Sequence, residues 1–296
     1  VENRGGAERL NPLANVAGGH LAPEGVLDEL SGFRGSVPVR INNAADAQVQ
    51  LDIFGPIVDV IAQLAKRGEP LATKHWILVN DLVAAVGARW KESDDGIWEV
   101  RSAPRQYTNS KLMCWVAVDR AIFLADYFTG EVQEEWIELR KEIADAIMEK
   151  CYKPEVNAFT SAYDGTDIDA SVMSIGLWGF IDVNDPKFQG TIKAVEEKLL
   201  VNNTVYRYKD VDDGLEGEEG GWHILTLWLV ECYLRSGRAS EASRLFSAVR
   251  KNIGATGLMC EQVNPETGEA LGNHPQAFSH LALINAAIAL AETRAE

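Results

Sequence analysis

The amino-acid sequence predicts an all-α protein with two layers of helices. In segment after segment, apolar residues recur at intervals of three and four, which places them on one face of an α-helix, whereas the alternating pattern of a half-buried β-strand is nearly absent. Some of these segments are apolar almost all round, as interior helices are, and others carry a charged face. We therefore expect inner helices that are shielded by a concentric layer of outer helices.

The chain begins with a loop-rich entrance, residues 1–36, in which Gly, Asn, Pro and Ala are frequent. Residues 38–43 are expected to be extended, because proline disfavours the helical conformation in the residue before it and because Val and Ile favour strands. We expect one helical domain over residues 37–296. The first residue is Val1 rather than Met and no signal-peptide pattern appears, so we expect this beginning to be internal to a longer protein.

From residue 44 onward, one predicted helix follows another. Pro56 suits the first turn of a helix, and Asp185 is expected to cap a helix that Pro186 opens. The last predicted helix is apolar on nearly every side and is expected to lie inside. About nine helices are predicted, over residues 44–64, 76–90, 111–127, 136–148, 169–178, 185–200, 222–234, 240–249 and 277–291.

A repeat solenoid is the competing helical architecture. Residues 234–242 resemble one unit of a tetratricopeptide-type hairpin. That pattern occurs once, and the lengths between hairpins vary, whereas repeat arrays need a fixed period and several copies. The layered arrangement is therefore the favoured prediction.

Composition and charge restrict the partners of the protein. The chain has 296 residues, of which 46% are hydrophobic, which is ample for a folded core. Its 28 basic and 44 acidic residues give a net charge of −16 at pH 7, which disfavours nucleic acid and anionic membrane surfaces as partners. No apolar run reaches the ~18 residues of a membrane span. We expect a soluble protein that takes a small neutral substrate.

Cysteine and histidine spacing indicates neither metal nor redox chemistry. The four cysteines form no CxxC and are interpreted as reduced core residues of a cytoplasmic protein, with disulfides as the second interpretation. The five histidines show no metal-ligand spacing, so we assign no metal. Because GxSxG, Walker and GxGxxG motifs are also absent, we expect no cofactor.

A Trp-Glu pair is the first candidate for catalysis. Asp94, Asp95 and Gly96 form a typical turn sequence, and Trp98 and Glu99 are expected to lie in the loop that follows this turn. A carboxyl group held against an apolar wall binds its proton more tightly and can donate it near neutrality. Taken alone, the pair is also typical of an ordinary surface loop.

Two further loops carry unusual residues just before apolar helices, which would place them at one rim. Residues 206–208 (Tyr-Arg-Tyr) precede an acidic, Gly-rich loop over 212–222, and residues 260–265 precede a second turn. The acidic loop could bind calcium, but it lacks the spacing of a helix-loop-helix calcium site, and a solvated loop is the favoured interpretation. Trp, Glu and Arg in loops suit a sugar ligand, since aromatic faces stack on pyranose rings and charged groups bind hydroxyls.

Several longer motifs follow one another from about residue 32 to the end. They are Gly35-Ser36, 38–45 (PVRINNAA), 48–52 (QVQLD), 95–101 (DGIWEVR), Ser110-Lys111, Asp119-Arg120, 206–208 (YRY), 258–261 (LMCE) and 272–280 (GNHPQAFSH). In content and order they resemble the catalytic domain of glycoside hydrolase family 15, the group of glucoamylases, glucodextranases and prokaryotic trehalases.

The resemblance implies an (α/α)6 barrel, a double ring of six inner and six outer helices, with the active site at the rim. It also implies inverting hydrolysis, in which Glu99 is the general acid and Glu261 the general base. Inversion needs the two carboxyl groups about 6.5–9.5 Å apart. The resemblance further implies five substrate-binding residues: Trp98, Arg207 and Trp222 in contact with sugar, Glu219 as a hydroxyl acceptor and Asp52 at the rim. As alternatives, Arg207 braces the acidic loop and Asp52 caps a helix.

The sequence departs from the family pattern in three ways. It predicts fewer helices than the family barrel has, as if the first ones were lacking. The β-sandwich that precedes the barrel in prokaryotic members is absent, and residues 106–111 read QYTNSK in place of HFTHSK. We expect hydrolysis of an α-glucoside, either trehalose, which is slightly favoured, or an α-1,4/α-1,6 gluco-oligosaccharide. The alternative is a truncated, catalytically inactive sugar-binding or assembly homologue. The sequence makes no prediction of the oligomeric state.

Overall fold

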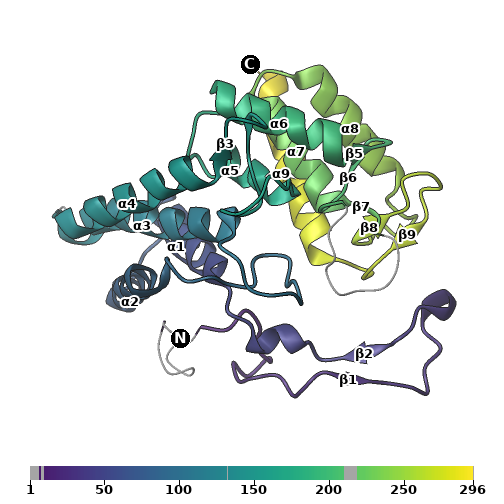
Figure 1. Cartoon of the computed structure of the whole chain (residues 1–296), viewed down its shortest axis with the longest axis horizontal. Coiled ribbons are helices and arrows are strands. Elements are labelled where there is room, and N and C mark those ends of the chain that lie inside the picture. Colours follow the sequence, from purple (N-terminus) through teal and green to yellow (C-terminus); the bar gives the residue numbers. More distant parts are fainter. Residues whose placement is uncertain (1–6, 8–9, 132, 210–218, 296) are drawn as a thin grey trace. The chain divides into compact units, whose positions relative to one another are not determined.

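The computed structural model describes residues 7, 10–131, 133–209 and 219–295, and these residues are predominantly helical (Figure 1). The predicted all-α class is confirmed. The chain divides into two compact units, Val1–Asp145 and Ala146–Glu296. The helices are α1 (Phe54–Lys66), α2 (Thr73–Arg89), α3 (Thr108–Thr129), α4 (Glu134–Lys150), α5 (Ser174–Leu177), α6 (Pro186–Leu199), α7 (His223–Arg235), α8 (Ala239–Lys251) and α9 (Ala277–Ala295).

Local sequence signals set the ends of these helices. Asp185 caps α6 as predicted, since its Oδ1 accepts a hydrogen bond of 2.8 Å from the backbone N–H of Lys187, and Pro186 is the first helical residue. Pro56 lies in the first turn of α1. Gly130 ends α3 with φ 66°, a left-handed conformation that glycine adopts without a Cβ penalty.

In the first unit, α3 packs against α1 and α2 and is buried along most of its length. The helices approach closely at Gly55 of α1, where a Cβ would lie 2.8 Å from the carbonyl oxygen of Met113. Two short 3₁₀ turns, Ala44–Ala47 and Leu51–Ile53, precede α1 within the segment that was predicted to be a single helix over 44–64. The loop that carries the predicted Trp-Glu pair is hydrogen-bonded to the segment that contains these turns.

In the second unit, α7 packs against α8 and α9. Most of its side chains are buried, including the polar His223 and Thr226, which confirms the prediction of an interior helix. The last helix, α9, is less enclosed than its apolar sequence predicts. One of its faces exposes Phe278, Leu281, Ile284 and Ile288.

Apart from the extended segment 38–43, the strands were not predicted, because each is only two residues long and so shows no alternation. The first unit pairs β1 (Gly25–Val26) with β2 (Arg40–Ile41), which lies in the segment expected to be extended. The second unit pairs β3 (Tyr152–Lys153) with β4 (Ala158–Phe159). It also holds an antiparallel five-stranded sheet of β5 (Leu200–Val201), β6 (Thr204–Val205), β7 (Gly221–Trp222), β8 (Gln262–Val263) and β9 (Ala270–Leu271).

The four cysteines are all buried, as the sequence predicts. Burial raises the pKa of the Cys114 thiol to about 12, so this side chain behaves as a small apolar core residue. Among the described helices, none combines the length and the apolar character that crossing a membrane requires.

Candidate functional site

Asp94 anchors the loop that carries Glu99. Its Oδ2 accepts hydrogen bonds from the backbone N–H of Leu51 at 2.9 Å and from the hydroxyl of Ser110 at 2.7 Å. Its backbone also pairs with that of Arg105 in an isolated antiparallel bridge. The predicted acidic turn is therefore tied to the start of α3 and to the 3₁₀ turn before α1, which fixes where the next residues can lie.

Glu99 follows this anchor in a left-handed conformation, with φ 54°. Such a backbone is uncommon for a residue other than glycine and often marks a functional position. The side chain is half-buried, and its Oε2 accepts a hydrogen bond of 2.9 Å from Nδ2 of Asn43. Trp98, the predicted apolar neighbour, is also half-buried.

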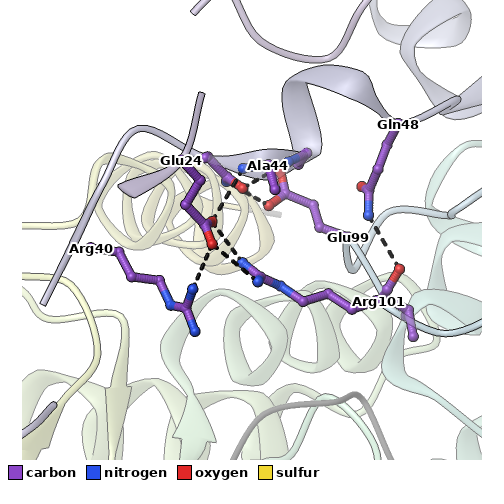
Figure 2. Close-up of polar contacts among 9 residues, drawn as sticks. Glu24, Arg40, Ala44, Gln48, Glu99 and Arg101 are labelled. Carbon is purple, nitrogen blue, oxygen red and sulfur yellow. Dashed lines mark hydrogen bonds and ion pairs between the residues drawn. The ribbon is translucent and has the colours of Figure 1, made fainter. Parts of the chain in front are cut away.

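An ion-pair cluster around Glu24 also contacts the loop that carries Glu99, through Arg101 (Figure 2). The carboxylate of Glu24 lies 2.8 Å from Arg101 Nη2 and 2.5 Å from Arg40 Nη1, and it accepts a hydrogen bond of 3.2 Å from the backbone N–H of Ala44. The hydrogen bond from Arg101 lowers the pKa of Glu24 to about 2. No motif in the sequence points to Glu24, because it stands alone in the loop-rich entrance.

Asp52 lies in the 3₁₀ turn Leu51–Ile53 with a carboxyl group that is not fully satisfied. Its Oδ1 is buried and has no hydrogen-bond partner among the described residues. Burial raises the pKa of Asp52 to about 7, and the charges of Asp94 and Glu99 add to the effect. Asp52 does not cap α1, whose N-cap position is Ile53 and carries no side-chain cap. Buried carboxyl groups with raised pKa values are frequent at functional sites.

In the second unit, three of the predicted sugar-binding residues form one cluster. Arg207 Nε lies 2.7 Å from Glu219 Oε1, and the indole N–H of Trp222 donates to the same oxygen at 3.1 Å. The guanidinium of Arg207 also lies over the ring of Trp222, 5.1 Å from its centroid. Arg207 thus braces the end of the acidic loop, as the alternative predicted. Residues 210–218 of that loop lie outside the described residues.

The five-stranded sheet brings Glu261 next to this cluster. Trp222 of β7 pairs with Gln262 of β8, and the backbone N–H of His223 donates to the carbonyl oxygen of Glu261 at 3.2 Å. Glu261 therefore lies at the start of the buried helix α7. The pairing places residues 221–222, at the end of the acidic loop, beside residues 262–263 of the second loop. This is consistent with the prediction that the two loops lie at one rim.

Three N–H groups surround the carboxylate of Glu261. Oε2 accepts from the backbone N–H of Asn273 at 3.0 Å and from its Nδ2 at 3.3 Å, and Oε1 accepts from Gln276 Nε2 at 3.3 Å. Gly272 has φ 68° and lies so close that a Cβ there would overlap Oε2 of Glu261. Asn273 and Gln276 lie in the quoted motif 272–280, but the sequence did not reveal what they contact.

The two candidate catalytic carboxyl groups thus differ in their surroundings. Glu261 accepts hydrogen bonds from three N–H groups, whereas Glu99 accepts one from a side chain. An ionised carboxylate can act as a base and a protonated one as an acid. Among the residues that the structure describes, no three His, Cys, Asp or Glu side chains are grouped as a metal site would require.

Comparisons with known proteins identify the family of the chain. The profile of "Glycosyl hydrolases family 15" matches residues 10–288. The chain is 37% identical over 265 residues to the trehalase of Thermoplasma acidophilum, covering 89% of this chain and 46% of that protein. It is 38% identical over 291 residues to the trehalase of Mycolicibacterium smegmatis, covering 97% of this chain and 43% of that protein. The chain thus spans less than half the length of these two relatives.

A solved glycosidase in complex with glucose shares the fold of the chain. The two superpose with a TM-score of 0.72 at 18% identity, over 87% of this chain and 72% of the glycosidase chain. At this identity the likeness shows the fold alone. It confirms the helical fold class that the sequence predicts.

Proposed function

The chain belongs to glycosyl hydrolase family 15, and we propose that the protein is an inverting α-glucosidase that hydrolyses trehalose. The observation that carries the proposal is the unequal hydrogen bonding of two carboxyl groups in a chain of this family. Glu261 accepts from three N–H groups and is assigned as the general base, and Glu99 accepts from one and is assigned as the general acid.

The reaction requires the two carboxyl groups to flank one glycosidic bond, about 6.5–9.5 Å apart, with room for a water molecule. Glu99 donates its proton to the glycosidic oxygen as the bond to the anomeric carbon breaks. Glu261 takes a proton from the water, which attacks the anomeric carbon from the opposite face. Trehalose and water thereby give one α-glucose and one β-glucose.

We assign sugar binding to residues that lie near one or the other of these two groups within its own unit. Arg207, Glu219 and Trp222 already share hydrogen bonds and a cation–π contact, so an aromatic face and charged groups are available together. Trp98 adjoins the acid, and Asp52 offers a buried carboxyl oxygen without a partner in the described structure. Trehalose is favoured over a glucan because the two relatives compared above are trehalases.

Steady-state kinetics on trehalose, maltose and isomaltose test the proposal. We expect the highest kcat/KM for trehalose. Glu99→Gln and Glu261→Gln should each lower kcat at least about 100-fold, because each removes an acid or base from the transition state. Glu266→Gln, at an exposed residue in the next turn, is the matched control and should keep the activity. Near-normal turnover in either of the first two variants would remove the role assigned to that residue.

A catalytically inactive sugar-binding or assembly protein is the second candidate, because the chain spans less than half the length of the compared trehalases. Titration calorimetry with trehalose separates the two candidates. Heat of binding without release of glucose favours the second, and release of glucose excludes it.

A further inference from the structure

Asn43 makes two hydrogen bonds with one amide group. It is the N-cap of the 3₁₀ turn Ala44–Ala47, with extended backbone angles of φ −148° and ψ 126°. Its Oδ1 accepts from the backbone N–H of Ala45 at 2.9 Å, and its Nδ2 donates to Oε2 of Glu99 at 2.9 Å. Asn43, at the end of the segment 38–43 that was expected to be extended, therefore joins this segment to the candidate acid.

The orientation of this amide follows from its partners. The backbone N–H of Ala45 can only donate, so it must face the amide oxygen of Asn43. That leaves the amide NH₂ group facing Glu99, and the assignment of oxygen and nitrogen is not arbitrary. Asn43 is held as a donor toward Glu99 for as long as the cap is in place.

A donor fixed on Oε2 restricts where the Glu99 proton can lie. An N–H group bonds to a lone pair, so Oε2 must serve as the acceptor, and a proton on the carboxyl group then resides on Oε1. We propose that Asn43 is a positioning residue that holds Oε2 of Glu99 and keeps the transferable proton on Oε1. The inference rests on the proposed function, in which Glu99 is the general acid.

The ion-pair cluster of Glu24 joins the two chain segments that carry the Asn43–Glu99 hydrogen bond (Figure 2). The Glu24 carboxylate binds the backbone N–H of Ala44, directly after Asn43, and also the guanidinium of Arg101, two residues after Glu99. One carboxylate thus ties the two segments together beside the Asn43–Glu99 hydrogen bond. Gln48 adds a second tie, since its Nε2 donates to the carbonyl oxygen of Val100 at 3.2 Å.

Two substitutions separate the donor role of Asn43 from its capping role. Asn43→Ser keeps an oxygen that can accept from Ala45 but is too short to reach Glu99. Asn43→Asp keeps the shape and the cap, has no N–H to donate, and adds a negative charge near Glu99. Asn15→Asp is the matched control, because Asn15 is an exposed residue whose Oδ1 likewise accepts from backbone N–H groups.

The pH profile of kcat/KM is the decisive kinetic readout. Without the donor, the ionised form of Glu99 is less favoured, so the alkaline limb should move up by about one pH unit in Asn43→Ser and further in Asn43→Asp. The kcat should fall about tenfold with little change in KM, because the proton of Glu99 is no longer kept on Oε1. Asp52 and Arg101, whose charges interact with that of Glu99, are unchanged in these variants.

Carboxyl ¹³C NMR of Glu99, assigned by comparison with Glu99→Gln, gives a readout that does not depend on turnover. Its titration midpoint should rise in both Asn43 variants and stay in Asn15→Asp. If neither the alkaline limb nor this midpoint moves, the inference about Asn43 is wrong. A wild-type protein that releases no glucose would remove the proposed function alone, and the NMR titration would still decide whether Asn43 controls Glu99.

Discussion

Gly272 lies directly against the carboxylate of Glu261, so that a side-chain carbon at residue 272 would overlap Oε2. The same glycine has φ 68°, a conformation that residues with a Cβ rarely adopt. Both observations disfavour a residue with a Cβ at this position. Because Gly272 has no side chain, Oε2 of Glu261 is accessible to the next residue, Asn273. The backbone N–H and the side-chain Nδ2 of Asn273 both donate to this oxygen.

Gly272→Ala should displace the Glu261 carboxylate and lower kcat at least about tenfold, since small misplacements of a catalytic group are costly. Gly268→Ala is the control, because Gly268 also has positive φ but a Cβ there would lie 3.7 Å from its nearest neighbour. Both variants should lose about 1 kcal/mol of stability from backbone strain. Enzyme kinetics together with denaturant unfolding measure the two effects, and equal kcat values in the two variants would contradict the role of Gly272.

Gln276→Glu removes an N–H donor from Glu261 but keeps the oxygen that accepts from the backbone N–H of Phe278 at the start of α9. The ionised form of Glu261 is then less favoured, and a second carboxylate stands nearby. We expect the acidic limb of the kcat/KM profile to move up by about one pH unit. An unchanged acidic limb would show that Gln276 does not support the base.

Asp52 makes the stability depend on pH. Its pKa is about 7 in the folded protein and about 3.9 in an unfolded chain, so the folded state retains a proton that the unfolded state loses between these values. The contribution of Asp52 is fully present below about pH 4 and is lost as the pH rises through about 7, by at most about 4 kcal/mol.

Asp52→Asn should therefore unfold at a higher temperature than the wild type at pH 8, and this difference should shrink toward pH 4. Asp145→Asn, at an exposed surface ion pair with Lys141, serves as the control and should leave the pH dependence unchanged. Thermal unfolding across this pH range measures both. If the unfolding temperatures of the wild type and of Asp52→Asn differed by the same amount at every pH, the buried carboxyl group of Asp52 would not titrate as described.

Much of the fold was predictable from local signals. Apolar spacing located the helices, and Asp185 and Pro186 marked the start of α6 as predicted. The five-stranded sheet was not predictable, because strands such as β7 and β8 are two residues long and pair across 40 residues of sequence or more. The exposed face of α9 was missed for a related reason, since composition shows how apolar a helix is but not what covers it.

The site was predictable as a set of residues but not as a set of contacts. The motifs named Glu99 and Glu261, yet the partners of their carboxyl groups lie elsewhere in the sequence. Asn43 is 56 residues from Glu99, and Gln276 is 15 residues from Glu261. Such contacts depend on how loops fold back on one another, which periodicity and turn residues do not specify.

The anomeric form of the first glucose released from trehalose tests the central claim most directly. Rapid ¹H NMR, recorded before the sugars equilibrate in solution, distinguishes α-glucose from β-glucose. Inversion with Glu99 as acid and Glu261 as base predicts equal amounts of the two forms at the earliest times. Release of α-glucose alone would contradict inversion and, with it, the assignment of Glu261 as a base that activates water.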